Sequence, residues 1–342
     1  MINLRNDYCG IAHYKVLEKL GKHANDVFVG YGLDEHSKRA SELIKKEMAY
    51  DDADIHFLVG GTITNKVLIS HVLRPYEAVI SPDTGHINVH ETGTIEQSGH
   101  KIITVKNNCG KLNAKDILDV LFTHTDEHMV KPKLVYITDS TEIGSIYTYQ
   151  ELKEISDVCK ANDLYLYLDG DRLAAALTCE KNDIKLSDLP KLVDAFYIGG
   201  TKNGLMLGEA LVIINEKIKD EVRYSIKHFG GMYAKGFVTG IQFEALFEDG
   251  LFYEIAKKEN EQAKYLYNEL VKIGVEFECI QETNQIFPVF KTEHIKELKE
   301  YIQFETWSIN EDKTTIRFVT HYLLKDEEIE ETIEIIKGII NK

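Results

Sequence analysis

The sequence has 342 residues, of which 44% are apolar and 28% are charged, with only five prolines. This composition is typical of a compact globular chain, and the length predicts one large domain with a smaller one. The formal net charge of −16 argues against a nucleic-acid groove, because binding a phosphate backbone needs concentrated lysine and arginine. No run approaches the roughly 18 unbroken apolar residues of a membrane span, so no membrane partner is expected.

The N-terminus and the cysteines both indicate a cytoplasmic protein. Residues 1–7 include polar and acidic side chains where a signal peptide would need an apolar run. The cysteines stand singly, without a Cys-x-x-Cys pair, which predicts neither a disulfide framework nor a zinc cluster. They are Cys9, Cys109, Cys159, Cys179 and Cys279. We therefore expect free, mostly structural thiols.

Helical and apolar segments alternate from about residue 36 to residue 215, as in a parallel sheet with helices on both faces. Glu35–Ala49 and Thr148–Ala161 are examples of the expected crossover helices. The expected strands are Asp54–Val59, Ala78–Ser81, Lys101–Val105, Lys133–Thr138, Leu164–Asp169, Ala195–Ile198 and Glu209–Ile214. Seven strands suit one mostly parallel sheet, so the expected fold class is α/β.

The pattern changes after about residue 250. A charged helix over Phe252–Ile273 leads to short strands at Val275–Cys279, Gln285–Val289 and Thr315–Phe318, and the chain ends in an acidic helix over Asp326–Ile340. This order predicts a smaller C-terminal α+β domain. The expected boundaries are residues 1–250 and 251–342, and the two parts should share an interface because no Pro/Ser linker separates them.

The first motif in chain order is Gly60-Gly61-Thr62, a glycine turn between an expected strand and an expected helix. Glycine lets a ligand approach the backbone, and the N–H groups and dipole of a helix N-terminus favour an anion such as phosphate. Thr62 adds a hydroxyl donor. A plain N-capped helix start is the structural alternative.

The second motif contains His86, His90 and Glu91. His86 can stack on a flat ring and serve as a base. A rival interpretation is a metal site, because His86 and His90 stand four residues apart and can share a helix face. The sequence is not His-Glu-x-x-His and no third ligand stands out, so we expect no metal. A structural histidine is a further alternative, above all for His90.

The third and fourth motifs are an aspartate and a lysine, each at the end of an expected strand. Asp169 ends one strand, at the edge where open α/β sheets bind ligands. Lys202 follows another strand in Gly199-Gly200-Thr201-Lys202, where burial would lower its pKa and free the amine to attack an aldehyde. Pyridoxal 5′-phosphate (PLP) needs both, a lysine for its aldehyde and a carboxylate beside its ring nitrogen. A helix-capping aspartate and a solvent-exposed turn lysine are the plain alternatives.

Two arginines are candidate anchors for a carboxylate. Arg172 lies three residues after Asp169, and Arg317 lies on an expected strand. Guanidinium groups bind carboxylates in a two-pronged fashion, as orienting an amino-acid substrate would require. An exposed strand arginine is the alternative for Arg317.

With these motifs, the chain resembles the low-specificity threonine aldolase and β-eliminating lyase family, PLP enzymes of the aspartate-aminotransferase fold type (fold type I). The resemblance spans nearly the whole chain. It is carried, in order, by Ile2–Asp7, Gly30–Asp34, Gly60–Thr62, Gly85–Ile87, Asp169–Arg172, Thr201–Gly204 and Arg317–His321. It implies a three-layer PLP-dependent transferase fold in a homodimer or homotetramer with shared active sites.

The resemblance also implies a role for each candidate residue. Lys202 would form the Schiff base, Asp169 would pair with the ring nitrogen, and His86 would stack on the ring. Gly60, Gly61 and Thr62 would hold the phosphate. His128 falls where the family has a second active-site histidine, a candidate base for the β-hydroxyl. The residues expected at the substrate are Asn6, Arg172 and Arg317, with Tyr31 offered to the partner subunit's site. Arg172 is expected at the cofactor as well.

Several positions depart from the family pattern. Asn6 replaces a serine, Asp171 an alanine, Tyr167 a histidine and Tyr233 an arginine, while Lys235 is a candidate replacement for the missing charge at the phosphate. Asp171 places a negative charge beside Arg172, the expected carboxylate anchor. The fold and cofactor are compatible with these changes, but the reaction depends on them.

The expected reaction is cleavage of the Cα–Cβ bond of a β-hydroxy-α-amino acid, giving glycine and an aldehyde, with His86 or His128 as the base. The same residues also support β-elimination or amino transfer on another small amino acid. A non-catalytic PLP-binding relative and a metal enzyme using His86 and His90 are the remaining alternatives.

Overall fold

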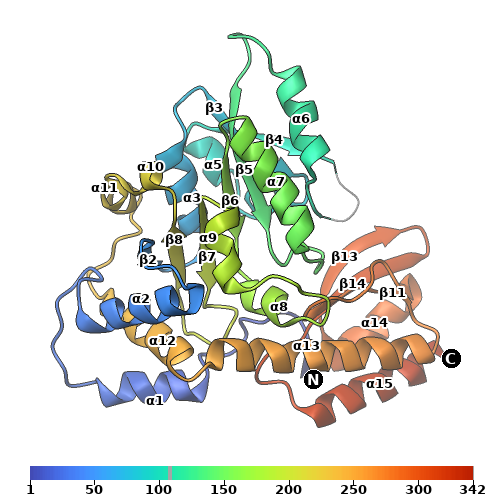
Figure 1. Cartoon of the computed structure of the whole chain (residues 1–342). Helices are drawn as coiled ribbons and strands as arrows, with labels where there is room; N and C mark the ends of the chain where they lie inside the picture. The colour runs from blue at the N-terminus through green and yellow to red at the C-terminus, as the bar shows by residue number, and fades with distance from the viewer. Residues whose placement is uncertain (107–109, 342) are drawn as a thin grey trace.

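The computed structural model describes residues 1–106 and 110–341 (Figure 1). Cys9, Cys159 and Cys179 are free thiols, whereas the thiol expected at Cys109 lies outside the described residues. Within these ranges, no helix combines the length and apolar character needed to cross a membrane.

All seven strands expected in the first part of the chain pair into one sheet, which confirms the α/β fold. Their order across the sheet is β2-β8-β7-β6-β5-β3-β4. β8 is antiparallel to both its neighbours and the other pairings are parallel, so the sheet is mostly parallel, as expected. The strands are β2 (Asp54–Leu58), β3 (Glu77–Pro82), β4 (Lys101–Val105), β5 (Lys131–Thr138), β6 (Tyr165–Asp169), β7 (Ala195–Gly199) and β8 (Glu209–Ile213).

Helices cover both faces of this sheet, which gives three layers (Figure 1). Because successive strand residues point to opposite faces, Phe196 and Ile198 of β7 join one apolar cluster while Ala195 and Tyr197 join another. Helices α2 (Glu35–Met48), α7 (Tyr149–Ala161) and α12 (Phe237–Glu248) pack on the first face, and α3 (Gly61–Val72) and α11 (Val222–His228) on the second. The sheet is therefore buried on both sides, as its continuous apolar runs require.

Local sequence explains where the expected helices begin. Asp34 accepts a hydrogen bond from the N–H of Ser37 and so starts α2. Thr148 and Glu151 form a reciprocal capping box at the start of α7. The other helices of this part are α1 (Tyr14–Lys22), α4 (His86–Val89), α5 (Thr94–Gln97), α6 (Ala114–Thr123), α8 (Leu173–Thr178), η1 (Leu186–Asp188), α9 (Leu189–Leu192) and α10 (Glu216–Lys219).

The C-terminal part is a smaller antiparallel sheet with helices on it. β14 lies at its centre and pairs with β10, β11 and β13. Its strands are β9 (Glu276–Phe277), β10 (Gln285–Ile286), β11 (Pro288–Lys291), β13 (Glu305–Asn310) and β14 (Lys313–Val319); its helices are α14 (Thr292–Tyr301) and α15 (Asp326–Ile340). β13 and α14 add to the elements expected from the sequence.

The N-terminal strand and α13 connect the two parts. β1 (Ile2–Asn3) pairs in parallel with β12 (Ile302–Gln303), and Leu4 lies in the apolar cluster of the C-terminal part. α13 (Leu251–Lys272) begins beside α12 and continues into the C-terminal part (Figure 1), so its apolar residues belong to both clusters. The first residues are thereby held between the small sheet and the large one.

Candidate active site

Asp169 lies at the C-terminal end of β6, buried, and receives three hydrogen bonds. Its Oδ2 accepts from the hydroxyl of Tyr136 at 2.6 Å and from Nδ2 of Asn65 at 3.0 Å, and its Oδ1 accepts from the N–H of Asp171 at 3.2 Å. Burial, together with the nearby charge of Asp171, raises the pKa of Asp169 to about 6. A cation beside this carboxylate would therefore be strongly favoured.

Asn65 connects Asp169 to His86 through a second buried carboxylate. Nδ2 of Asn65 also donates to Oε1 of Glu91 at 2.7 Å, and Nδ1 of His86 lies 2.8 Å from the same Oε1. The hydroxyl of Tyr167 donates to Oδ1 of Asn65 at 2.8 Å and fixes its orientation. Tyr167, which replaces the family's histidine, therefore supports this network rather than facing a ligand directly.

His86 begins α4 and keeps a quarter of its side chain exposed. Burial opposes a charge on this ring, but the hydrogen bond to Glu91 and the nearby carboxylates of Glu142 and Asp169 outweigh burial and raise the pKa of His86 to about 9. The ring of His90 lies 5.5 Å from that of His86. Glu91 therefore orients His86 and holds its proton, while Nε2 of His86 remains for another group.

Lys202 lies in the turn between β7 and β8, and its ammonium group forms an ion pair with Oδ2 of Asp171. The ring of Tyr8 lies 5.7 Å from Nζ. Burial and Arg172 lower the pKa of Lys202, but the carboxylates of Asp171, Asp7 and Glu142 outweigh them, so that the pKa is raised. The expectation of a lowered lysine pKa is therefore wrong, because the turn brings a counter-ion to the buried amine.

Glu209, at the start of β8, fixes the turn that carries Lys202. Its two carboxylate oxygens accept from the N–H of Gly200 and from the hydroxyl of Thr201, each at 2.8 Å. The N–H of Gly208 donates to the same hydroxyl at 3.1 Å. Burial and the neighbouring Asp171 raise the pKa of Glu209 well above its usual range.

The glycine turn after β2 leads into the N-terminus of α3, and no side chain caps this helix. Thr62 is exposed there, while a Cβ atom at Gly61 would lie 2.9 Å from the hydroxyl of Tyr197. A helix start with open N–H groups is suited to an anion. Because Asn65 in the next turn of α3 bonds to Asp169, this anion site adjoins the carboxylate.

Arg172 immediately precedes α8 and forms a buried ion pair with Asp7. Its Nε and Nη2 donate to the two carboxylate oxygens of Asp7 at 2.7 and 3.0 Å, and Asn284 donates to the same carboxylate at 3.0 Å. Burial raises the pKa of Asp7, but Arg172 and Lys202 outweigh it and lower that pKa to about 2. Nε and Nη2 of Arg172 are thus already bonded to Asp7.

Arg317, on β14, has no ion pair among the described residues. Its buried Nε has no hydrogen-bond partner there, and its guanidinium group lies 5.8 Å from the ring of Trp307. Burial and the positive charge of Arg172 lower the pKa of Arg317, while Asp7 and Glu142 raise it. A half-buried cation whose Nε is buried without a partner is suited to a carboxylate ligand.

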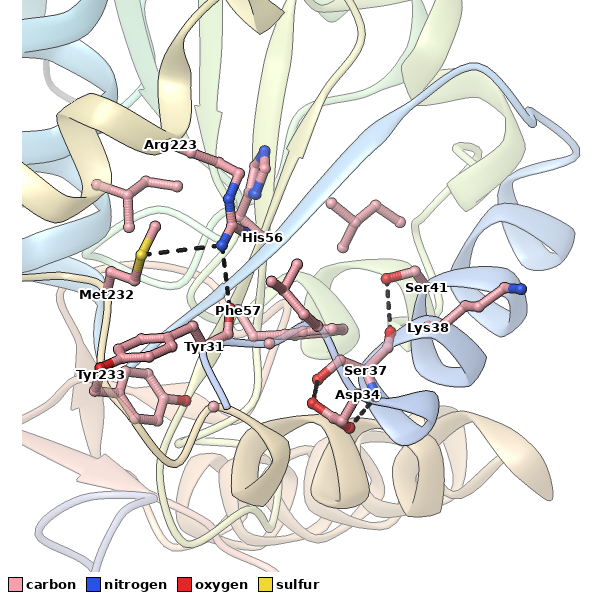
Figure 2. A pocket seen from close by; sticks show the side chains of 15 residues that line it. Tyr31, Asp34, Ser37, Lys38, Ser41, His56, Phe57, Arg223, Met232 and Tyr233 are labelled. Carbon is pink, nitrogen blue, oxygen red and sulfur yellow. Dashed lines mark hydrogen bonds between the residues drawn. The ribbon is translucent and has the colours of Figure 1, made fainter. Parts of the chain in front are cut away.

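Other candidate residues do not join this group within one chain. His128 is exposed just before the first residue of β5. Asp139 and the site lie at the other end of that strand. Figure 2 shows Tyr31 and Tyr233 together, with Arg223, at a separate cavity of about 270 Å³. Lys235 is exposed in the same segment. Asn6 is half-buried, and its side chain accepts from the N–H of Tyr8 at 3.2 Å.

The residues that do come together fit PLP on structural grounds. Lys202 offers an amine for the aldehyde, the α3 N-terminus offers N–H groups for the phosphate, and Asp169 offers a buried carboxylate for the ring nitrogen. These three features are tied together by the bonds through Asp171 and Asn65. The site thus has a partner for the aldehyde, the phosphate and the ring nitrogen of the cofactor.

Comparison with known proteins agrees with this fit. The family model described as β-eliminating lyase matches residues 23–293. The chain belongs to the β-eliminating lyase family. A low-specificity L-threonine aldolase from Pseudomonas sp. is 33% identical over 263 residues, or 75% of each chain. A solved threonine aldolase from Leishmania major is 41% identical, with a TM-score of 0.98 over 99% of this chain and all of that one.

A more distant structural neighbour supports the fold. An aspartate aminotransferase from Thermus thermophilus has a TM-score of 0.74 at 14% identity, covering 99% of this chain and 91% of that one, which shows the fold alone. The chain is a PLP-dependent lyase of fold type I, as the sequence motifs indicated.

Sequence reasoning missed the residues that orient the site. Glu91 stands within the second motif and Asn65 follows the first by three residues, but their bonds to His86 and Asp169 depend on side-chain placement. Asp7 is 165 residues from Arg172 in the chain. The acidic residue Glu209 in an otherwise apolar strand was a usable signal, because a buried charge requires partners.

Proposed function

We propose that this chain cleaves a β-hydroxy-α-amino acid of the threonine type into glycine and an aldehyde. The single observation that carries the proposal is the bonded series Lys202–Asp171–Asp169–Asn65–Glu91–His86, which joins a cofactor lysine to an oriented histidine. Relatives over most of the chain are low-specificity L-threonine aldolases. When bound, PLP supplies a ring that accepts the electron pair left on Cα.

The residues of the chain take distinct roles in this proposal. Lys202 bonds to the cofactor, Asp169 keeps the ring nitrogen protonated, and Gly60, Gly61 and Thr62 hold the phosphate. Arg317 binds the substrate carboxylate with its open donors. Arg172 contributes through Nη1, the nitrogen that Asp7 leaves open, and is held in place by that residue. Asn6 stands beside this pair and is a further contact for the carboxylate.

His86 is the proposed base for the β-hydroxyl proton. Its Nδ1 is bonded to Glu91, so Nε2 is the nitrogen that accepts the proton. Because the pKa of His86 is about 9, only a minor fraction of the ring is neutral at pH 7. Activity should therefore increase as the pH approaches about 9.

Product analysis tests this function. Purified protein with PLP is incubated with threonine and, separately, with allo-threonine; we expect equal amounts of glycine and acetaldehyde. Lys202→Ala with PLP and PLP without protein are the controls, and both should give background rates. Formation of a keto acid and ammonia without glycine would instead show elimination and would overturn the aldol assignment.

We further propose that copies of this chain assemble and share active sites in the cytoplasm. The segment before α2 exposes several apolar side chains: Val27 is 97%, Val29 63%, Leu33 64% and Tyr31 47% exposed. Such a segment favours burial against a second copy, which would place Tyr31 in the partner's site. The free thiols at Cys9, Cys159 and Cys179 are consistent with a reducing compartment.

The division into residues 1–250 and 251–342 is also a proposal. The two-sided core of the large sheet and the separate cluster of the small sheet support it. α13 spans both clusters, so we expect the two parts to unfold together rather than one after the other.

A further inference from the structure

Asp171 is the carboxylate in direct contact with the cofactor lysine. It lies between Asp169 and Arg172 in the turn from β6 to α8, and its Oδ2 pairs with Nζ of Lys202. The two side chains are 20% and 14% exposed, so water screens the pair only weakly. Sequence spacing places this charge beside Arg172, but in the folded chain it pairs with Lys202.

The backbone fixes the position of Asp171 closely. Its N–H donates to Oδ1 of Asp169 at 3.2 Å. A Cβ atom at Gly199 would lie 2.1 Å from the carbonyl oxygen of Asp171, so the turn packs directly on the end of β7 that leads to Lys202. Both partners of the ion pair are thus held by the same contact between two strand ends.

Other charged groups also act on Lys202, but no second salt bridge to Nζ is present among residues 1–106 and 110–341. The other charged or titratable side chains that face Lys202 are Asp7, Tyr8, Glu142, Glu209, Arg172, His86 and His90. Arg172 is neutralised by Asp7, and Glu209 is bonded to the backbone of the turn. Asp171 is therefore the specific partner of the lysine nitrogen.

The reaction requires Lys202 to leave the cofactor when the substrate amine is bound and to return afterwards. A released lysine side chain has several rotatable bonds, so holding it in one place costs entropy unless a partner fixes it. A carboxylate in contact fixes it and favours positive charge on its nitrogen. Relying on the function proposed above, we propose that Asp171 is a positioning residue: it holds Nζ of Lys202 beside the cofactor when the two are apart, and it stabilises positive charge on that nitrogen when they are bonded.

The proposal predicts a shift in the pH titration of the cofactor's visible absorbance. Full-length protein loaded with PLP is titrated as wild type, Asp171→Asn and Asp171→Glu. Asp171→Asn should move the midpoint down by about 1–3 pH units, because a contacting charge changes a pKa by that amount. Asp171→Glu keeps the charge and should titrate close to wild type.

Two further variants complete the design. Asp157→Asn removes an exposed charge that pairs with Lys153, and should leave the midpoint unchanged, which controls for net charge. Asp171→Ala removes the carboxylate without adding another polar group, so it provides a second test if Asp171→Asn folds poorly. It should shift the midpoint in the same direction as Asp171→Asn.

The possible outcomes separate this proposal from the proposed function. If Asp171→Asn and Asp171→Ala titrate like wild type, Asp171 does not control the charge on Lys202 and the proposal is overturned, even if wild type cleaves threonine. If the midpoints shift as expected but wild type forms no glycine, the role of Asp171 is supported and the proposed reaction fails.

Discussion

Arg172 and Arg317 bring the same guanidinium group to the site but meet different partners. Asp7 occupies two nitrogens of Arg172, whereas Arg317 has no ion pair among the described side chains. The sequence shows two arginines in suitable places. Only the fold shows which of the two guanidinium groups has donors without a partner in the chain. Arg317 is therefore the residue at which substrate affinity should be most sensitive.

Replacing Arg317 with glutamine should raise the KM for threonine by about 10–100-fold, because losing a hydrogen bond to a charged group costs about 1.5–3 kcal/mol. The visible spectrum of the bound cofactor should change little, since the role proposed for Arg317 is to bind the substrate carboxylate and not the cofactor. Steady-state kinetics measures this, and Arg39→Gln, at an exposed position on α2, is the control. An unchanged KM would assign the carboxylate to another group.

The pair His86–Glu91 gives a prediction about pH. In the wild type, kcat/KM should rise with pH until about pH 9, because His86 must be neutral to accept a proton. Glu91→Gln removes the hydrogen-bonded charge. The pH at which kcat/KM rises should therefore fall toward about 6.5, the usual pKa of histidine. The measurement is the pH profile of glycine formation, with Glu96→Gln on the neighbouring helix α5 as control. If Glu91→Gln leaves the pH dependence of kcat/KM unchanged, His86 is excluded as the base.

At the same scale, the identities of Lys202, Asp169 and His86 were predictable from the sequence because each follows a strong apolar or glycine pattern. Their charges were not. The raised pKa of Lys202 depends on contact with Asp171, and that of His86 on contact with Glu91. Both contacts are set by side-chain directions that sequence spacing does not define.

Among the elements, the N-terminal segment is the one whose importance the structure adds. β1 pairs with β12, the carbonyl of Leu4 accepts from the N–H of Val319 at 2.8 Å, and Asp7 reaches Arg172. A two-residue strand has no period that a sequence pattern can reveal. β13 was missed for a different reason: Glu305–Asn310 is an edge strand with mostly polar or half-buried residues.

Asp7→Asn should destabilise the protein by about 3–5 kcal/mol, because it leaves Arg172 charged and buried without its partner. The pKa of Asp7 is lowered to about 2, so the pair stabilises the fold above the usual aspartate pKa, and this is lost as the pH falls through about 2. Urea unfolding at neutral pH measures the loss. Asp163→Asn, in an exposed pair with Lys133, should show no comparable effect.

The start of α3 gives a second prediction for an element. Gly61→Ala should cost about 1–3 kcal/mol, because the added Cβ meets the hydroxyl of Tyr197 at 2.9 Å. Tyr197→Phe in the same chain should recover part of this loss. Gly60→Ala is the matched control for folding, since a Cβ atom there would meet nothing within 4 Å and its φ of 178° is ordinary extended backbone. Equal losses at both glycines would contradict the steric explanation.

For the whole molecule, sequence pattern predicted the large sheet well because its strands are continuous apolar runs between amphipathic helices. The strand order and the antiparallel β8 became visible only with the structure. His128 illustrates the limit of resemblance: the family pattern places it in an active site, yet within one chain it is exposed at the far end of β5. Within one chain the fold therefore does not bring His128 to the residues around Lys202.

Assembly can be tested with Val27→Glu combined with Val29→Glu. Both side chains are exposed in the single chain, so the change should not unfold it, but it should prevent burial against a second copy. We expect a dimer or larger species for the wild type and a monomer of low activity for the variant, measured by sedimentation and glycine formation. Val271→Glu on α13 is the control. A fully active wild-type monomer would contradict shared sites.

The contact between Asp7 and Arg172 has a practical consequence for handling the protein. A purification tag fused ahead of Met1 would be joined to the short segment that carries β1 and Asp7, and any pull on that segment acts on the turn holding Asp169, Asp171 and Arg172. Batches tagged at this end should differ from untagged protein in colour and pH response, and not merely in yield. A tag placed after α15 is not attached to the segment that carries Asp7. It is therefore the better choice for preparing protein for spectroscopy.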